Sequence, residues 1–146
     1  MSNILLAIAG LSPQVITETL YALHQENVSV DEIHIIATRI GRDAIATQLL
    51  TPRDGHFNRY LRDYGIAPQA IRFSVDTVYV LRDENGNPID DITGEDENEI
   101  LLRACLTVAH RLTKDSRDTV FFSIAGGRKT MSACLMVAAQ MYARPQ

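Results

Sequence analysis

The sequence predicts an α/β fold: a mainly parallel central sheet flanked by helices. Short apolar runs of strand length alternate along the chain with stretches whose apolar residues recur at helical spacing, and this alternation is typical of strand–helix–strand units. Two of the strand-like runs lead directly into glycine-containing turns that open a helix-like stretch. With 146 residues, the chain is long enough for one such domain and too short for two.

The first half of the chain begins with a strand and a well-marked helix. Residues 4–9 are an uninterrupted apolar run, which predicts a buried strand. Pro13 suits the first helical position with Ser12 as the N-cap, and the helical spacing of apolar residues continues to about Gln25. The other elements expected here are a strand at 32–38, a helix at 44–50, a short helix at 56–64 and a third strand at 71–75.

The second half contains a polar insertion before its regular elements. Residues 77–92 begin with the alternating Val78 and Val80 and continue into the run Asp83-Glu84-Asn85-Gly86-Asn87-Pro88, which predicts an irregular hairpin or a long loop. This insertion either closes over a ligand as a lid or is merely solvated. The remaining elements are expected at 97–112 (helix), 119–125 (strand) and 130–142 (helix).

Composition and charge narrow the class of protein. The formal net charge is −4, with 14 basic and 18 acidic residues, so the chain is not expected to bind long nucleic acid through bulk charge. No apolar run is long enough to span a bilayer and no secretory signal is evident, so we expect no membrane contact and a cytoplasmic location. Cys105 and Cys134 lie in helix-like patterns without metal-site spacing, which favours buried, reduced thiols.

The two glycine turns are the strongest functional signal. A helix N-terminus offers unpaired N–H groups and a partial positive charge, and glycine lets a ligand approach the backbone closely. The second turn adds Arg128 and Lys129, which favours a nucleotide-type ligand with several phosphates. Neither turn matches a dinucleotide-binding or P-loop fingerprint. Taken alone, each could also be a tight connection without a ligand.

Other polar residues are weaker candidates for contacting a ligand. Thr38, Arg39 and Arg42 follow the second strand, so they either line the same crevice and contact ribose or adenine, or form a solvated loop. Asp90 and Asp91 are expected to order their loop; no third ligand is evident, which disfavours a metal site. The four histidines lie far in sequence from both turns. Only His56, in an expected loop, is a candidate for reaching a ligand, and surface or packing roles are expected for His24, His34 and His110.

Two segments resemble the hallmark motifs of a known family. The segments Ala9-Gly10-Leu11-Ser12-Pro13-Gln14-Val15-Ile16-Thr17-Glu18-Thr19-Leu20 and Ser123-Ile124-Ala125-Gly126-Gly127-Arg128-Lys129-Thr130-Met131-Ser132 are similar to those of the CRISPR-associated Rossmann-fold (CARF) ring nucleases. Asp90-Asp91-Ile92 also resembles a family element. The resemblance covers most of the chain and implies a Rossmann-like fold. It further implies a homodimer that binds cyclic tetra-adenylate, the second messenger of type III CRISPR defence, and cuts it to linear di-adenylate.

The resemblance also implies roles for individual residues. Ser12 and Lys129 match the family's functional hydroxyl and lysine. In cleavage by transesterification the nucleophile is the ligand's own 2′-hydroxyl, so neither a metal nor a cofactor is required. Lys129 is suited to the charge that develops on phosphorus, and Ser12 to orienting the 2′-hydroxyl or a phosphate oxygen. The remaining cradle would come from Gly10, Leu11, Gln14, Gly126, Gly127, Arg128 and Thr130.

Three functional readings follow. We expect residues 1–146 to form a single CARF-like ring nuclease domain. Family members usually continue beyond the last helix with a further strand, so the chain is expected to be a short natural member, a truncated chain or one domain of a longer protein. The first alternative is a CARF sensor domain that binds cyclic oligoadenylate and regulates an effector without significant cleavage. The second is a small phosphate-binding domain unrelated to CRISPR defence. The sequence does not fix the ring size.

Overall fold

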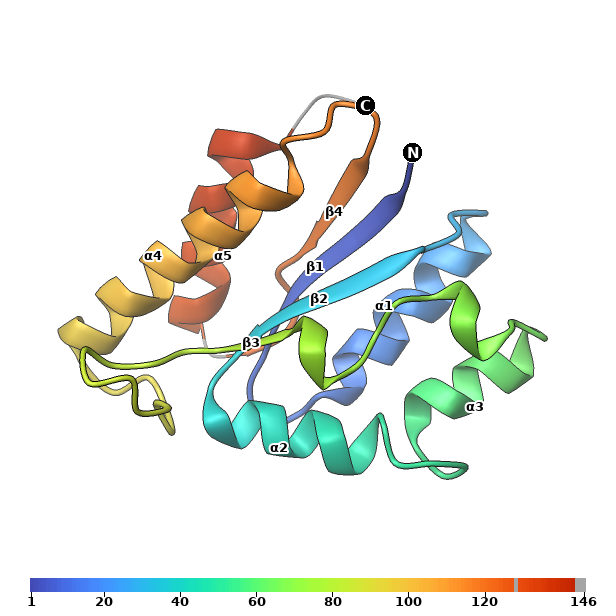
Figure 1. Cartoon of the computed structure of the whole chain (residues 1–146), viewed down its shortest axis with the longest axis horizontal. Helices are drawn as coiled ribbons and strands as arrows, with labels where there is room; N and C mark the ends of the chain where they lie inside the picture. Colours follow the sequence, from blue (N-terminus) through green and yellow to red (C-terminus); the bar gives the residue numbers. More distant parts are fainter. Residues whose placement is uncertain (128, 144–146) are drawn as a thin grey trace.

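A four-stranded parallel sheet forms the centre of the molecule. The computed structural model describes residues 1–127 and 129–143 (Figure 1). The strand order is β3-β2-β1-β4, and every strand pairing is parallel. This confirms the α/β, Rossmann-like class that the alternating pattern predicts. The strands are β1 (Asn3–Ala9), β2 (Glu32–Ala37), β3 (Val78–Val80) and β4 (Thr119–Ser123).

Helices cover both faces of the sheet. In Figure 1, α1, α2 and α3 lie on one side, and α4 and α5 lie together on the other. Successive side chains of a strand point to opposite faces, so Leu5 and Ala9 of β1 join the core under the first group, whereas Leu6 and Ile8 join the core under the second. The helices are α1 (Gln14–Gln25), α2 (Arg39–Gln48), α3 (His56–Asp63), α4 (Glu95–Leu112) and α5 (Lys129–Tyr142).

The connections that follow β1 and β4 lie on opposite faces of the sheet. After β1 the chain leaves through α1 toward β2, and after β4 it leaves through α5 on the opposite face of the sheet. The two strands pair in parallel, with Ala7 opposite Ser123, so their carboxyl ends lie side by side. In open α/β sheets, ligands bind beyond the carboxyl ends of strands whose connections diverge in this way.

The third strand lies later than the sequence pattern predicts. The strand expected at 71–75 is wrong: β3 begins at Val78, and residues before it form short 3₁₀ turns at Pro68–Ala70 and Val75–Thr77. Ser74 and Thr77 exchange side-chain and backbone hydrogen bonds as a capping box, which turns the chain away from the sheet. Within the stretch 71–75, Arg72 makes an isolated parallel bridge to Glu32.

The insertion after β3 is a small hairpin with a buried base. Leu81 donates its N–H to the carbonyl of Ala37 (3.0 Å), and Ile89 donates to the carbonyl of Leu81 (2.8 Å). Leu81, Ile89 and Ile92 are buried in the core under α4 and α5, whereas residues 82–87 are exposed. The hairpin alternative is therefore correct, and its base is part of the folded core. Within the described residues, no helix has the length and hydropathy needed to cross a membrane.

Candidate functional site

A hollow of about 350 Å³ lies beyond the carboxyl ends of β1, β2 and β4. Both glycine turns contribute to it, as the sequence predicts from their positions after neighbouring strands. The hairpin that follows β3 and the start of α2 complete its wall. The lining residues are Gly10, Leu11, Ser12, Thr38, Ile40, Asp90, Asp91, Gly127 and Met131.

The second glycine turn packs directly against β1. A Cβ atom at Gly126 would lie 2.6 Å from the carbonyl oxygen of Ile8, which leaves no room for a side chain. Gly127 has a φ of +75°, a left-handed conformation that disfavours other residues, and a Cβ there would lie 3.1 Å from the Sδ of Met131. Glycine at these two positions therefore allows the turn to pass close over β1 and enter α5.

Ser132 holds this turn from the first turn of α5. Its Oγ lies 2.8 Å from the carbonyl oxygen of Ile124 and 3.1 Å from that of Gly126, so the hydroxyl is shared between two backbone acceptors. Serine side chains commonly satisfy backbone groups near helix ends in this manner. The sequence motif includes Ser132, but the pattern alone gave it no role. The structure identifies it as a residue that positions the turn.

Ser12 is available to a ligand. The sequence predicts Ser12 as the N-cap of the first helix, and this is wrong by one residue: Pro13 occupies the cap position, and Ile16 donates its N–H to the carbonyl of Pro13 (3.0 Å). Ser12 is exposed and lines the hollow. Its hydroxyl makes no hydrogen bond within the parts of the chain that the structure describes, so it is free to contact a bound oxygen or hydroxyl.

Lys129 lies beside the hollow without lining it. It is the first residue of α5, two positions after Gly127, and it is exposed. Gln14 and Thr130 are also exposed at the starts of their helices, and Gly126 is buried where the second turn packs against β1. The first turns of α1 and α5 therefore begin next to the hollow, where their N–H groups favour an anion. Arg128, which the sequence predicts as a ligand contact, lies outside the described residues.

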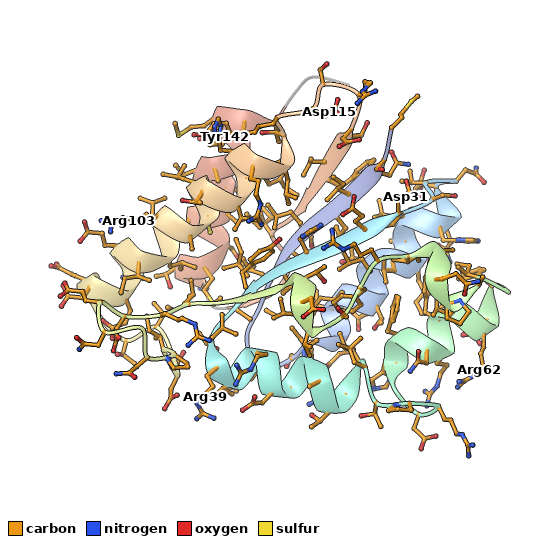
Figure 2. The ribbon with its side chains drawn as sticks, in the orientation of Figure 1. Asp31, Arg39, Arg62, Arg103, Asp115 and Tyr142 are labelled. Atoms are coloured by element: carbon orange, nitrogen blue, oxygen red, sulfur yellow. The ribbon has the colours of Figure 1, made fainter. Side chains whose placement is uncertain are left out.

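Arg39 binds carboxylates instead of lining the hollow. Its Nε lies 2.6 Å from Oδ1 of Asp90, and its NH1 lies 3.1 Å from Oδ2 of Asp43; Figure 2 labels Arg39 at the start of α2. Hydrogen bonding to this guanidinium holds the pKa of Asp90 below its usual range. Because Arg39 is absent from the lining, its predicted role as a direct ligand contact gains no support from the geometry. Arg42 likewise contacts Asp43.

Backbone and capping contacts hold the start of α2 against the hairpin. Thr38 is buried and its hydroxyl accepts a hydrogen bond from the N–H of Gly41 (3.1 Å), as an N-cap. Arg39 donates its backbone N–H to the carbonyl of Ile89 (2.8 Å), one residue before Asp90. In the hairpin, Asp91 accepts from the N–H of Ile92 (2.8 Å). Thr38 therefore lines the hollow with its hydroxyl already hydrogen-bonded. Asp90 is held between Ile89, whose carbonyl accepts from Arg39, and Asp91, which accepts from the N–H of Ile92.

The histidines lie away from the hollow. None lines it among the described residues; His56 is the first residue of α3, and His34 is buried in β2 with its ring between Tyr79 (2.8 Å) and Glu32 (3.1 Å). Burial lowers the pKa of His34. In the described part of the chain, no three His, Cys, Asp or Glu side chains are grouped as a metal site would require.

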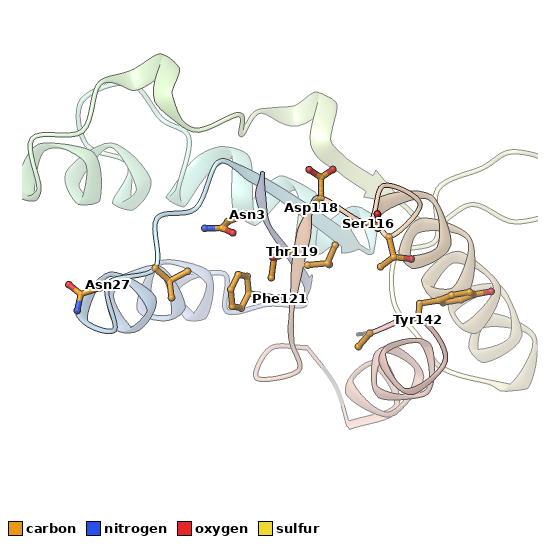
Figure 3. Close-up of a pocket in the computed structure, with 11 residues that line it drawn as sticks. Asn3, Asn27, Ser116, Asp118, Thr119, Phe121 and Tyr142 are labelled. Atoms are coloured by element: carbon orange, nitrogen blue, oxygen red, sulfur yellow. The ribbon is translucent and has the colours of Figure 1, made fainter. Parts of the chain in front are cut away.

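Another hollow, of about 430 Å³, lies at the opposite end of the sheet (Figure 3). It is lined by Asn3 and Thr119 at the starts of β1 and β4, and by the ends of helices at Asn27, Thr113 and Tyr142. Helix C-termini carry partial negative charge, and Asp118 adds a carboxylate. This end of the sheet therefore disfavours an anion, and the candidate site is the hollow at the glycine turns.

Comparison with known protein families gives a match over most of the chain. A family model described as CRISPR-associated protein NE0113 matches residues 12–146. The match begins at Ser12 and includes the second glycine turn, the hairpin and all of the elements after β1. No curated protein matches the sequence.

Proposed function

Because the chain belongs to the CRISPR-associated protein NE0113 family, we propose that it binds cyclic tetra-adenylate at the two glycine turns and cleaves the ring to linear di-adenylate. The observation that carries the proposal is the meeting of two helix N-termini beside one hollow with Ser12 in its wall. This arrangement suits a phosphodiester, whose oxygens accept hydrogen bonds from backbone N–H groups. Cleavage would switch off the signal that the ring carries.

The proposed reaction is a metal-independent transesterification. The 2′-hydroxyl oxygen of one ribose attacks the adjacent phosphorus, and the bond from phosphorus to the 5′-oxygen of the next nucleotide breaks. The 2′-proton ends on the departing 5′-oxygen, so the products carry a 2′,3′-cyclic phosphate and a 5′-hydroxyl. Lys129 supplies positive charge to the phosphoryl oxygens, and Ser12 orients the 2′-hydroxyl or a phosphate oxygen. Because no histidine lines the described hollow, we expect slow turnover.

The size of the hollow supports a homodimer. About 350 Å³ is near the lower limit of the range of roughly 300–1,000 Å³ for small-molecule sites, so one hollow suits one nucleotide better than a ring of four. Two copies related by a two-fold axis would offer the same turns to opposite sides of the ring. Cleavage at both sites would then give two di-adenylates.

The exposed apolar side chains support the same assembly. Five large apolar residues are exposed on the glycine turns and α5: Leu11, Ile124, Met136, Val137 and Met141. No acidic or basic residue occurs from Thr130 to Tyr142, so two copies of this helix can face one another without charge repulsion. A stable interface buries about 800 Å² on each partner, which is more than one helix face of this length supplies. We therefore propose that the dimer interface joins α5 to the exposed turns beside the hollow.

The position of Lys129 favours a second candidate function. Lys129 begins α5 but does not line the hollow, so the hollow can hold a phosphate without placing this ammonium on it. A sensor that binds cyclic oligoadenylate and regulates an effector would need the residues that bind the ring but not a lysine at the phosphate that is cleaved. We rank this function second, because it leaves the exposed Lys129 without a role.

The test is incubation of the purified protein with cyclic tetra-adenylate in excess EDTA, followed by chromatography coupled to mass spectrometry. The expected product is di-adenylate ending in a 2′,3′-cyclic phosphate. Lys129→Ala should lose cleavage and retain binding. Lys114→Ala is the matched control, since Lys114 is the only other lysine, is exposed and lies after α4 at the far end of the sheet.

The outcomes separate the candidates. Cleavage that is lost in Lys129→Ala and kept in Lys114→Ala supports the ring nuclease. Intact ring that co-elutes with the wild-type protein supports the sensor. A protein that binds no cyclic tetra-adenylate at micromolar concentration would exclude the ring nuclease and any sensor of this ring size.

A further inference from the structure

A carboxylate in the wall of an anion site requires an explanation. Asp90 and Asp91 line the same hollow as Gly10, Ser12 and Gly127, where the proposed function places a phosphate. Oδ1 of Asp91 accepts the N–H of Ile92 (2.8 Å), whereas Asp90 is bound by a side chain of another element. An ionised carboxylate near a phosphate is repelled by it unless a cation compensates the charge. Asp90 therefore either weakens the binding of an anion or makes a direct hydrogen bond to the ligand.

Arg39 compensates the charge of Asp90 from outside the hollow. The Nε of Arg39 lies 2.6 Å from Oδ1 of Asp90, and Arg39 does not line the hollow. The second carboxylate on this guanidinium, that of Asp43 (3.1 Å), is also outside the lining. Arg42 also contacts Asp43 (3.3 Å), so these two arginines and two carboxylates carry no net charge together. The carboxylate of Asp90 can therefore face the hollow with little repulsion of a phosphate.

The position of Asp90 is fixed before a ligand arrives. Arg39 holds Oδ1 of Asp90 with its side chain and holds the carbonyl of Ile89, the preceding residue, with its backbone N–H (2.8 Å). Ile89 and Ile92 on either side are buried in the core. Within the described residues, no hydrogen bond engages Oδ2 of Asp90. One carboxylate oxygen is therefore occupied and oriented, and the other is available, which is the preorganisation that a selective contact needs.

The chemistry of the available oxygen restricts what it can bind. An ionised carboxylate only accepts hydrogen bonds, so its ligand partner must be an O–H or N–H group and cannot be a phosphate oxygen. In the linked ring each ribose keeps one hydroxyl, the 2′-OH, on the carbon next to the one that carries the 3′-phosphate ester, whereas the amino group of adenine lies at the far side of the base. In a hollow of about 350 Å³ that also contains the phosphate turns, the ribose hydroxyl is the nearer donor.

We propose that Asp90 accepts a hydrogen bond from a ribose hydroxyl of the bound nucleotide, with Arg39 as the residue that positions and neutralises it, so that the site selects ribonucleotides over 2′-deoxyribonucleotides. The inference rests on the proposed function, because it takes the glycine turns as the phosphate site. It assigns substrate selectivity to a residue outside both glycine motifs.

The test compares binding of cyclic tetra-adenylate and its all-2′-deoxy analogue, which cannot be cleaved through a 2′-hydroxyl. Dissociation constants are measured by calorimetry in EDTA, with Lys129→Ala used as the background so that the ribose ring stays intact. Hydrogen bonds to charged groups are worth about tenfold in affinity or more, so the background protein should prefer the ribose ring by on the order of tenfold. Asp90→Ala should abolish this preference, and Asp90→Asn, which keeps an acceptor oxygen, should retain part of it.

Asp43→Ala provides the matched control. It removes the other carboxylate on Arg39 but leaves the lining of the hollow intact, so the preference for the ribose ring should survive. A protein that binds neither ring would contradict the proposed function. A protein that binds both rings equally, or whose preference persists in Asp90→Ala, would overturn this inference while leaving the proposed function standing. When cyclic tetra-guanylate is titrated alongside, loss of the preference for adenine in Asp90→Ala, with ribose preference unchanged, would assign the carboxylate to the base and also overturn the inference.

Discussion

The Oγ of Ser132 lies 3.1 Å from the carbonyl oxygen of Gly126 and 2.8 Å from that of Ile124. One hydroxyl in the first turn of α5 thereby ties down the loop through which the chain enters that helix. The loop forms one wall of the candidate site, through Gly127. This contact between the helix and the loop thus controls the shape of the hollow without touching a ligand.

Replacement of this hydroxyl should affect binding more than stability. Ser132→Ala removes a partly exposed hydrogen bond worth about 1 kcal/mol, so we expect only a small decrease in the free energy of unfolding. Loosening of the turn should weaken binding of cyclic tetra-adenylate severalfold. Ser132→Thr keeps the hydroxyl and should restore binding. Calorimetric titration with urea unfolding measures both effects, and equal binding by the alanine and threonine variants would contradict the positioning role.

The close approach of the second turn to β1 predicts a large cost at Gly126. A methyl group there would lie 2.6 Å from the carbonyl oxygen of Ile8, so the backbone must shift, and overpacking of this kind costs about 1–3 kcal/mol. Gly94→Ala is the control, because a Cβ at Gly94 meets nothing closer than 3.6 Å and its φ is extended. We expect it to cost below about 1 kcal/mol. Urea unfolding of both variants measures the difference. A Gly126→Ala protein as stable as Gly94→Ala would show that the backbone of the turn shifts at little cost in free energy, which contradicts the prediction.

The Arg39–Asp90 pair predicts a partial rescue. Arg39→Ala leaves the carboxylate of Asp90 uncompensated beside the phosphate site, so the affinity for cyclic tetra-adenylate should fall. Asp90→Ala in the same protein removes the repelling charge and should recover part of that affinity. If Arg39 bound the phosphate itself, the double variant would bind as weakly as Arg39→Ala or more weakly. Titrations of the two single variants and the double variant, compared as a cycle, decide between these roles.

Much of the fold was predictable because the patterns of its elements are local. The apolar run that forms β1 and the helical spacing of α1, α4 and α5 depend only on neighbouring residues, and the structure places these elements within a few positions of the expected bounds. The third strand was misplaced because the side chains of Ser74 and Thr77 cap a short turn, which diverts an apolar stretch that otherwise suits a strand. The secondary-structure propensities of single residues contain no information about such a specific side-chain contact.

The candidate site was predictable where the fold itself brings the residues together. The two glycine turns follow parallel strands that the alternating pattern implies, so their meeting at one hollow was expected. The role of Arg39 was not, because its partner Asp90 lies 51 positions away on a hairpin whose path depends on buried Ile89 and Ile92. A sequence pattern shows an arginine after a strand, but it does not show which carboxylate the arginine will meet.

Buried His34 predicts a decrease in stability in mild acid. Burial is the largest influence on it and lowers its pKa, against the opposing hydrogen bond to Glu32; Tyr79, Arg72 and Arg111 are its other polar neighbours. The folded protein therefore takes up this proton at lower pH than the unfolded chain, whose histidine titrates near about 6.5. The contribution is fully present above that pH and is lost as the pH falls toward the folded pKa, by up to about 1.4 kcal/mol per pH unit.

Urea unfolding between pH 8 and pH 5 measures this effect. His34→Gln should flatten the decline below pH 6.5, whatever its effect on stability at pH 8. His110→Gln, at an exposed position on α4, is the control for replacement of a histidine by glutamine. Identical slopes for wild type and His34→Gln would contradict the assignment of the proton to this ring.

The exposed face of α5 predicts a dimer that a single charge can break. Met136 and Val137 are each 43% exposed on a helix without charged residues after Lys129, so a charge there can be solvated in the monomer but not in a dimer interface. We expect the wild type to elute as a dimer in size-exclusion chromatography with light scattering, and Met136→Glu to elute as a folded monomer with weaker binding of cyclic tetra-adenylate. Val75→Glu, at an exposed apolar residue outside α5 and the glycine turns, should remain dimeric. A monomeric wild type, or a Met136→Glu protein that stays dimeric, would place the partner surface elsewhere and remove the explanation of how a hollow for one nucleotide holds a ring of four.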